Sequence, residues 1–287
     1  MRNAEAVDSG ARARNARLRP ARWSAIAQRA YADFWMPSRL EAYRALLETA
    51  LREGYRICSV GQAGRTLRAG LPLGDRVLVL RHDVDTGVRT ARRMWSIEQE
   101  LGISSSYFFR LRTLDVPFLR AIAEGGGEAS YHFEEFSTLA LRRRIRRRED
   151  FAAVLPQARA LFAGNLANLR ERTGLAMEVV AAHGDWLNRR LGVQNSEILA
   201  SESFRREVGV VLEAYDPVLL QALLKHSDGP PSEPWLWESR DPQRSILSGV
   251  PAIQVLVHPR HWRVERGVNL RDDVARCAEE LWYRIGR

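Results

Sequence analysis

Residues 77–87 read Val-Leu-Val-Leu-Arg-His-Asp-Val-Asp-Thr-Gly, and the expected architecture of the chain follows from this run. Its four aliphatic residues in succession predict a strand buried on both faces, as in a parallel sheet covered by helices. Asp83 and Asp85 are two residues apart, so an extended backbone points both carboxylates to the same side. Such a pair at the carboxyl end of a parallel strand lies where α/β folds and barrels carry their chemistry.

Two carboxylates side by side at a strand end repel each other unless a cation or a proton lies between them. We therefore interpret Asp83 and Asp85 as part of a functional site. The alternative is a turn in which one of them caps the next helix, a task that Thr86 can also perform. His82 alternates with Asp83 and is expected to face the other side of the strand as structural support.

The alternation of strand and helix continues along the chain. Helices are expected over 38–52, 88–101, 117–124, 149–172 and 271–285, and strands over 55–60, 104–109, 128–133, 176–183 and 252–257. Residues 61–75 are predicted to be a loop. The pattern is weaker over residues 184–250, where loops are expected over 184–188 and 228–234 and short strands near Gly209–Leu212 and Trp235–Trp237. This alternation predicts an α/β fold with mostly parallel strands, and a barrel is favoured. We expect one domain over residues 23–287, preceded by a disordered, arginine-rich tail over residues 1–22.

The net charge of +9 is concentrated in two places. Residues 1–22 carry a net charge of +4, the run Arg142–Arg148 contributes six arginines, and the rest of the chain sums to −1. We interpret these as a mobile tail and one solvated helix face, and expect no nucleic-acid partner.

Membrane and secretory signals are not evident in the sequence. No apolar run approaches the ~20 residues needed to cross a bilayer, and the N-terminus lacks the apolar core of a secretory signal. The two cysteines, Cys58 and Cys277, are expected to be buried free thiols. These features predict a cytoplasmic protein.

Polar residues recur where apolar strands are predicted to end. Three of the six histidines occupy such places: His132, His183 and His258. A lone histidine there is more often a core residue, but three histidines and two aspartates on converging strand ends favour a divalent metal. Histidine nitrogen and aspartate oxygen are typical ligands of Zn²⁺, which lowers the pKa of bound water to about 7 and polarises carbonyl groups. The residues alone therefore predict a mononuclear metallohydrolase.

Four segments resemble, in order, motifs of the polysaccharide deacetylase (NodB-homology, carbohydrate esterase family 4-like) family. They are His82–Asp85, Tyr107–Arg110, Glu128–Glu135 and Val257–Pro259. The resemblance extends from about residue 38 to residue 265 and is closest to the branch whose first motif is His-Asp-Val-Asp. It implies a distorted (β/α) barrel that removes an acyl group, usually acetyl, from an amino sugar.

The resemblance also implies catalytic roles for individual residues. Asp83 corresponds to the general base, and Asp85 and His132 correspond to metal ligands. His258 resembles the late histidine that protonates the leaving amine. Arg110 either holds Asp83 in its charged form or is an exposed arginine without such a role.

The third metal ligand is left open by the resemblance. The family pattern has a further histidine four residues after His132, and this chain has Phe136 at that position. His183 is our first choice for the missing ligand because it also ends a predicted strand. Glu134 or Glu135 is the second choice.

Five residues near the predicted strand ends are expected to contact the substrate: Arg110, Glu135, Asp185, Trp186 and Asn188. Tryptophan faces suit the apolar surfaces of sugars, and ordinary loop packing is the alternative.

The expected function is a zinc-dependent deacetylase of carbohydrate metabolism. Its substrate would be an acylated amino sugar, nucleotide- or lipid-linked, used for surface polysaccharide. A non-catalytic relative that binds metal or sugar is the alternative, because position 136 lacks the expected histidine. A third possibility is a nucleic-acid-associated protein that uses the tail and Arg142–Arg148.

Overall fold

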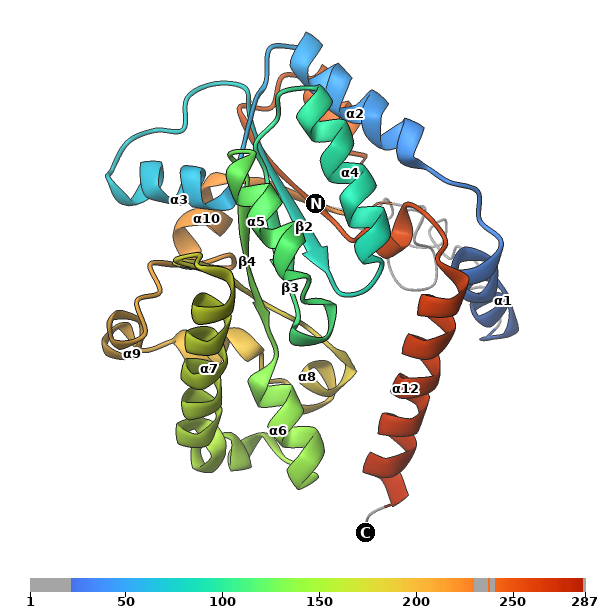
Figure 1. The fold of residues 1–287 in the computed structure, drawn as a ribbon, viewed down its shortest axis with the longest axis vertical. Coiled ribbons are helices and arrows are strands. Elements are labelled where there is room, and N and C mark those ends of the chain that lie inside the picture. The colour runs from blue at the N-terminus through green and yellow to red at the C-terminus, as the bar shows by residue number, and fades with distance from the viewer. Residues whose placement is uncertain (1–21, 230–236, 238–240, 286–287) are drawn as a thin grey trace, which may run out of the picture.

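One sheet of parallel strands runs through the centre of the molecule (Figure 1). The structure, a computed structural model, describes residues 22–229, 237 and 241–285, with side chains from residue 27 onward. The strands are β1 (Arg56–Cys58), β2 (Val77–Val84), β3 (Ser106–Phe109), β4 (Glu128–Phe133), β5 (Val179–Ala182), β6 (Leu212–Glu213), β7 (Leu224–Ser227) and β8 (Ala252–Val257). Their order is β6-β5-β4-β3-β2-β8-β7, with β1 also paired to β2, and every pair is parallel. The predicted parallel α/β fold is confirmed.

Helices connect these strands and cover the sheet. They are α1 (Arg22–Phe34), α2 (Leu40–Arg52), α3 (Val60–Arg68), α4 (Val88–Glu100), α5 (Val116–Glu124), α6 (Glu135–Arg143), α7 (Phe151–Thr173), α8 (Trp186–Leu191), α9 (Glu202–Glu207), α10 (Pro217–Ala222), α11 (Pro242–Leu247) and α12 (Arg266–Ile285). Short 3-10 helices are η1 (Leu111–Thr113), η2 (Arg148–Asp150), η3 (Asn195–Leu199) and η4 (Pro259–His261). Figure 1 shows α12 at the side of the molecule, next to α1 at its N-terminal end.

The apolar side chains of β2 are the reason that helices cover both faces of the sheet. All eight of its residues are buried. Leu78 and Leu80 pack with residues of α2 and α4 on one face. Val77 and Val79 pack on the other face with residues of α3 and α10. Burying each aliphatic side chain contributes about 1.5–3 kcal/mol, so a strand of this composition is stable only between two helical layers.

The sheet curls into a half-barrel around the second of these clusters. Val79 of β2 and Leu212 of β6 belong to the same buried cluster, although three strands separate them in the sheet. Within the part of the chain that the structure describes, the end strands β6 and β7 do not pair with each other. The barrel is therefore distorted and open, with α3 and α10 filling its inner side.

His82 has the structural role that its place in the strand predicts. Its ring stacks on Tyr107 with 3.9 Å between ring centroids. Its Nε2 lies 2.8 Å from the hydroxyl of Tyr43 and 3.0 Å from the carboxylate of Glu98. Burial tends to raise the pKa of Glu98, but His82 and its other hydrogen-bond partners hold that pKa below its usual value. This network joins α2 and α4 to the sheet on the face away from Asp83.

The secondary structure differs from the prediction in residues 61–75 and in the region 184–250. The predicted loop over 61–75 begins with α3, because Ser59 and Gln62 form a capping box at its N-terminus. In the region 184–250, β6 lies at the end of the strand expected near Gly209–Leu212, and β7 was not predicted. The strand expected near Trp235–Trp237 lies outside the described residues except for Trp237. Both thiols are free, but only Cys58 is buried, and Cys277 is exposed on α12.

The arginine run is not one solvated helix face. α6 ends at Arg143, and Arg144 adopts a left-handed conformation with φ of 55°. The guanidinium groups of Arg144 and Arg146 lie over the rings of Trp282 and Tyr283, at 4.1 and 3.9 Å from their centroids. This part of the run holds α12 against the body of the protein, which corrects the prediction.

Residues 1–21 of the predicted tail lie outside the described residues. Across the helices that are described, none is long and apolar enough to cross a membrane.

Candidate active site

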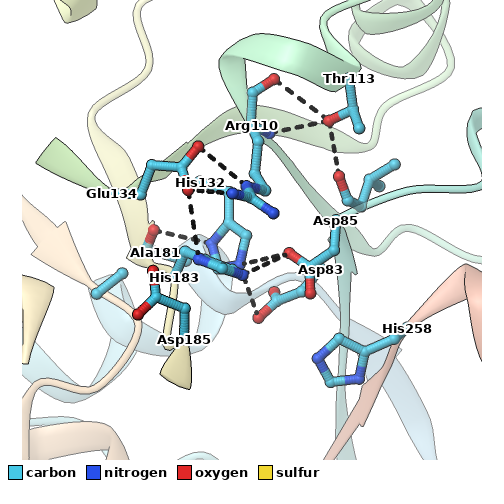
Figure 2. Close-up of polar contacts among 12 residues, drawn as sticks. Asp83, Asp85, Arg110, Thr113, His132, Glu134, Ala181, His183, Asp185 and His258 are labelled. Atoms are coloured by element: carbon cyan, nitrogen blue, oxygen red, sulfur yellow. Dashed lines mark hydrogen bonds and ion pairs between the residues drawn. The ribbon is translucent and has the colours of Figure 1, made fainter. Parts of the chain in front are cut away.

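Five side chains predicted at strand ends meet at the carboxyl edge of the sheet. Asp83 is in β2 and Asp85 follows it, His132 is in β4, His183 follows β5, and His258 follows β8. Figure 2 shows the rings of His132 and His183 directed at the two aspartates, with His258 on the other side of them. Asp83, Asp85, His183 and His258 line a cavity of about 270 Å³, as the convergence of parallel strand ends predicts.

Asp85, His132 and His183 form a candidate metal centre. One carboxylate oxygen of Asp85, Oδ1, lies 3.3 Å from Nε2 of His132 and 3.4 Å from Nε2 of His183. The three candidate ligand atoms all lie within 4.8 Å of one another. Nδ1 of His132 is 3.0 Å from the carbonyl oxygen of Ala181, which leaves Nε2 for a ligand role. Asp85 Oδ1 is buried and has no hydrogen-bond partner within the described chain, so these residues fit a divalent cation.

The electrostatics of the cluster suit metal binding. Burial tends to raise the pKa of Asp85, but His183 and His132 hold that pKa well below its usual range. Burial, followed by the nearby charge of Arg110, holds the pKa of His183 well below its usual value. A carboxylate and a neutral imidazole are the forms that coordinate a metal.

The carboxylate of Asp83 is held by Arg81, a residue that the sequence analysis missed. Nε and Nη2 of Arg81 donate to the two oxygens of Asp83, each over 2.8 Å. Burial tends to raise the pKa of Asp83, but Arg81 and then His132 lower it. Neither alternative for Arg110 holds: it is buried, and it donates to Glu134 and not to Asp83, over 3.1 Å from Nε. Residue parity is the signal that could have found Arg81, since residues 81, 83 and 85 share one side of an extended strand.

His258 is paired with a second buried carboxylate, Asp228. Nδ1 of His258 donates to Oδ1 of Asp228 over 2.6 Å. The other oxygen, Oδ2, accepts from the backbone N–H of His258 over 2.7 Å and from Nε1 of Trp262 over 2.9 Å. Burial tends to lower the pKa of His258, but Asp228 raises it to about 9. Asp228 was missed because it follows β7, a short strand without a hydrophobic pattern.

A second group of possible metal ligands surrounds Asp228. Nδ1 of His261 lies 3.2 Å from the same oxygen that His258 contacts, so Asp228, His258 and His261 also lie within ligand reach of one another. This group differs from the first because its carboxylate oxygens already accept hydrogen bonds. It is therefore the weaker candidate for a metal centre.

The residues expected to contact substrate divide into two sets. Arg110, Asp185 and Trp186 line the cavity. Glu135 and Asn188 lie outside its lining. Glu135 accepts hydrogen bonds from the hydroxyl of Tyr131 and from Nδ2 of Asn165, and Asn188 supports its own loop by donating to the carbonyl of Val193. These contacts explain both side chains as structural, so neither is proposed as a substrate contact.

The comparisons with known proteins give distant matches only. No protein-family model and no curated protein matches this chain. Solved structures that resemble it include a CE4 family pseudoenzyme from Bacillus anthracis, with 13% identity and a TM-score of 0.33 over 71% of this chain and 60% of that one. A mutant of a CE4 family pseudoenzyme with restored enzymatic activity matches with 12% identity and the same TM-score, over 71% of this chain and 62% of that one.

The Xyl-CE4 domain of a multidomain xylanase, from the hindgut metagenome of Trinervitermes trinervoides, is also similar. It has 9% identity and a TM-score of 0.33, over 70% of this chain and 83% of that domain. This chain spans about three fifths of the length of the two pseudoenzyme chains.

Proposed function

We propose that this protein is a metal-dependent hydrolase that removes an acyl group, acetyl in the simplest case, from an amino sugar or a related amide. The proposal rests on one observation: the candidate metal centre shares a cavity with an arginine-held carboxylate and a carboxylate-held histidine. Amide hydrolysis requires a group that accepts a proton from water and one that delivers a proton to the departing nitrogen. Asp83 and His258 supply these two groups.

Asp85, His132 and His183 would hold the metal, and Zn²⁺ is our first choice because the donor set is nitrogen and carboxylate oxygen. When bound there, such an ion polarises an amide carbonyl and lowers the pKa of water. His183 takes the place of the histidine absent at position 136. Phe136 is buried in α6, so no ligand is expected from that position.

Asp83 acts as the proton acceptor in this proposal. Its pKa is lowered, so the carboxylate is charged at neutral pH and ready to take a proton from the attacking water. The two hydrogen bonds from Arg81 fix the orientation of the carboxylate beside the metal ligands. A carboxylate fixed in this way needs little reorganisation when the water attacks.

His258 acts as the proton donor. Its pKa of about 9 keeps the imidazole protonated at neutral pH, and Asp228 orients the ring by accepting from Nδ1. Nε2 is then the atom that gives its proton to the amine nitrogen as the carbon–nitrogen bond breaks. Figure 2 shows His258 on the other side of the two aspartates from His132 and His183, and it lines the same cavity as Asp85 and His183.

Amine release from a panel of acetylated amino sugars tests this function. The wild-type protein loaded with Zn²⁺ should release free amine, and Asp83→Asn should lose at least about a hundredfold in rate while it retains metal. Arg271→Ala, on an exposed part of α12, is the control and should behave as wild type. Metal binding without amine release from any panel member would instead favour a non-catalytic binding protein.

A further inference from the structure

The outer wall of the cavity is built by residues that the proposed chemistry does not use. α12 contributes Asp272, Arg276 and Glu279, which are spaced by four and three residues and so share one face of the helix. α1 contributes Arg29, and α8 contributes Arg189 beside Trp186. The ring of Trp186 contacts that of Tyr283 on α12, with centroids 5.3 Å apart. The rim is therefore a wall of charged residues where α8 and α12 meet.

Most arginines of this wall already have carboxylate partners. Arg260 donates to Asp272 over 2.7 Å and to Asp273 over 2.8 Å. Arg29 donates to Asp273 over 3.0 Å, and Arg112 lies 2.8 Å from Asp272. The aspartates at the start of α12 are thus shared among several guanidinium groups and have little capacity for another.

Arg276 is different from these arginines. Its side chain is partly buried, lines the cavity, and makes no ion pair or hydrogen bond among residues 27–229 and 241–285. Burial, followed by the positive charge of Arg29, lowers the pKa of Arg276. Glu279, one turn further along α12, has Arg112 and Arg110 as its main cationic neighbours. Asp272 and Asp273 oppose the shift in the pKa of Arg276, but both already accept hydrogen bonds from Arg260, so neither is a counter-ion of Arg276 alone. A partly buried guanidinium that no carboxylate binds directly is suited to an anion supplied from outside the chain.

Arg189 provides a second free cation on the same rim. It lies on α8, lines the cavity and is exposed, and its side chain makes no ion pair within the described part of the chain. Guanidinium groups from two helices can bind different oxygens of one tetrahedral anion, which suits phosphate better than a planar carboxylate.

We propose that the substrate carries a phosphate group, and that Arg276 on α12, assisted by Arg189 on α8, binds this group at the rim of the cavity. This inference rests on the proposed function, because it assigns the phosphate to the acylated amino sugar whose amide lies at Asp83 and His258. The phosphate group is common to sugar phosphates, nucleotide-linked sugars and lipid-linked sugars. Arg276 is then a specificity-determining residue that selects a phosphorylated substrate over a neutral one.

Phosphate binding can be measured without turnover. The probes are inorganic phosphate and pyrophosphate, titrated calorimetrically into the full chain after a chelator has removed divalent ions that bind phosphate themselves. Wild type should bind, Arg276→Ala should weaken binding about tenfold or more, and Arg276→Lys should restore part of the loss. Arg271→Ala is the matched control, since it removes an exposed arginine one and a half turns earlier on the same helix, and it should bind as wild type. No binding by wild type, or an equal loss in Arg271→Ala, would overturn the proposal.

Steady-state kinetics then test whether the bound phosphate group belongs to the substrate. An acetylated amino sugar with a phosphate should have a lower KM than the same sugar without it, and Arg276→Ala should raise KM about tenfold for the phosphorylated sugar only. Equal KM values for the two sugars in wild type would contradict the proposal. A nucleoside diphosphate and a short-chain alkyl phosphate, compared in the calorimetric assay, distinguish a nucleotide-linked from a lipid-linked source of the phosphate. If phosphate binding requires Arg276 but the protein hydrolyses no acetylated sugar, the proposed hydrolase function is wrong and the proposed anion site still stands.

Discussion

Arg81 and Asp83 are bound to each other within a single strand, by two parallel hydrogen bonds of 2.8 Å on the inner side of β2. The guanidinium also lies over the ring of Tyr215, 4.5 Å from its centroid. The arginine that holds the proposed proton acceptor therefore comes from the same strand as the acceptor. Its side chain is fully buried, so its charge is not screened by solvent.

Replacing Arg81 should affect both stability and the pH profile. Arg81→Gln leaves Asp83 as an unpaired buried carboxylate, and the free energy of unfolding near neutral pH should fall by about 3–5 kcal/mol. In wild type, the pairing stabilises the fold above the pKa of an unfolded aspartate, about 3.9, and this stabilisation is lost as the pH falls through the lower folded pKa. Urea unfolding measures the first effect. The acid limb of kcat/KM should also move to higher pH, because the pKa of Asp83 rises.

Arg110→Gln is the control for that substitution. It removes the partner of Glu134 and leaves the contact between Arg81 and Asp83 intact. Its acid limb should therefore match that of wild type. An acid limb that moves in Arg110→Gln and not in Arg81→Gln would return the assignment to Arg110.

Metal binding should depend on His183. His183→Asn removes one of three ligands, and the affinity for Zn²⁺ should fall at least about a hundredfold, as it should in His132→Asn. Competition with a chromogenic chelator measures these affinities. His261→Asn is the matched control, since His261 belongs to the second candidate group and should leave the affinity unchanged. Loss of metal in His261→Asn alone would place the ion at Asp228 instead.

The alkaline limb of activity should report the state of His258. The proton donor is lost as the pH rises through about 9, so wild-type kcat/KM should decline above that pH. Asp228→Asn removes the charge that raises this pKa, and burial then lowers it. The alkaline limb should move down by about two pH units or more. Trp262→Phe removes a hydrogen bond to the same carboxylate but leaves its charge, and it should leave the limb near pH 9.

Glu135 should influence stability and not catalysis. Burial raises its pKa to about 7, although the hydrogen bonds from Asn165 and Tyr131 oppose this. The folded state therefore binds a proton more tightly than the unfolded state, and stability falls as the pH rises from about 4.3, the unfolded value, through 7. Glu135→Gln cannot ionise, so it should be more stable than wild type at pH 8 and similar at pH 4, with a gain of up to about 4 kcal/mol.

Thermal or urea unfolding at the two pH values checks the Glu135 prediction. The kcat/KM of Glu135→Gln should equal that of wild type, because the side chain lies outside the cavity lining. A loss of activity without a change in stability would revive Glu135 as a substrate contact.

The features predicted correctly from the sequence are those that depend on residues close together in the chain. β2 was predicted from its aliphatic run, and the shared side of Asp83 and Asp85 was predicted from the period of a strand. The pairing of Arg81 with Asp83 obeys the same period, but Arg110 was the arginine considered for it, because the choice between two arginines depends on where each side chain reaches. Asp228 had no local signal, since β7 is short and gains its stability from pairing with β8.

The sequence by itself determined the parallel α/β class and the strand ends at which His132, His183 and His258 appear, because alternation and hydrophobic runs are properties of neighbouring residues. Only the tertiary structure decided which partners those residues have. The pairing of His258 with Asp228 joins the ends of two adjacent strands, and the cavity wall at Arg276 joins α12 to α1 and α8. Such contacts depend on how the strands are ordered and how the helices pack. Neither can be deduced from the residues that adjoin a given residue in the sequence.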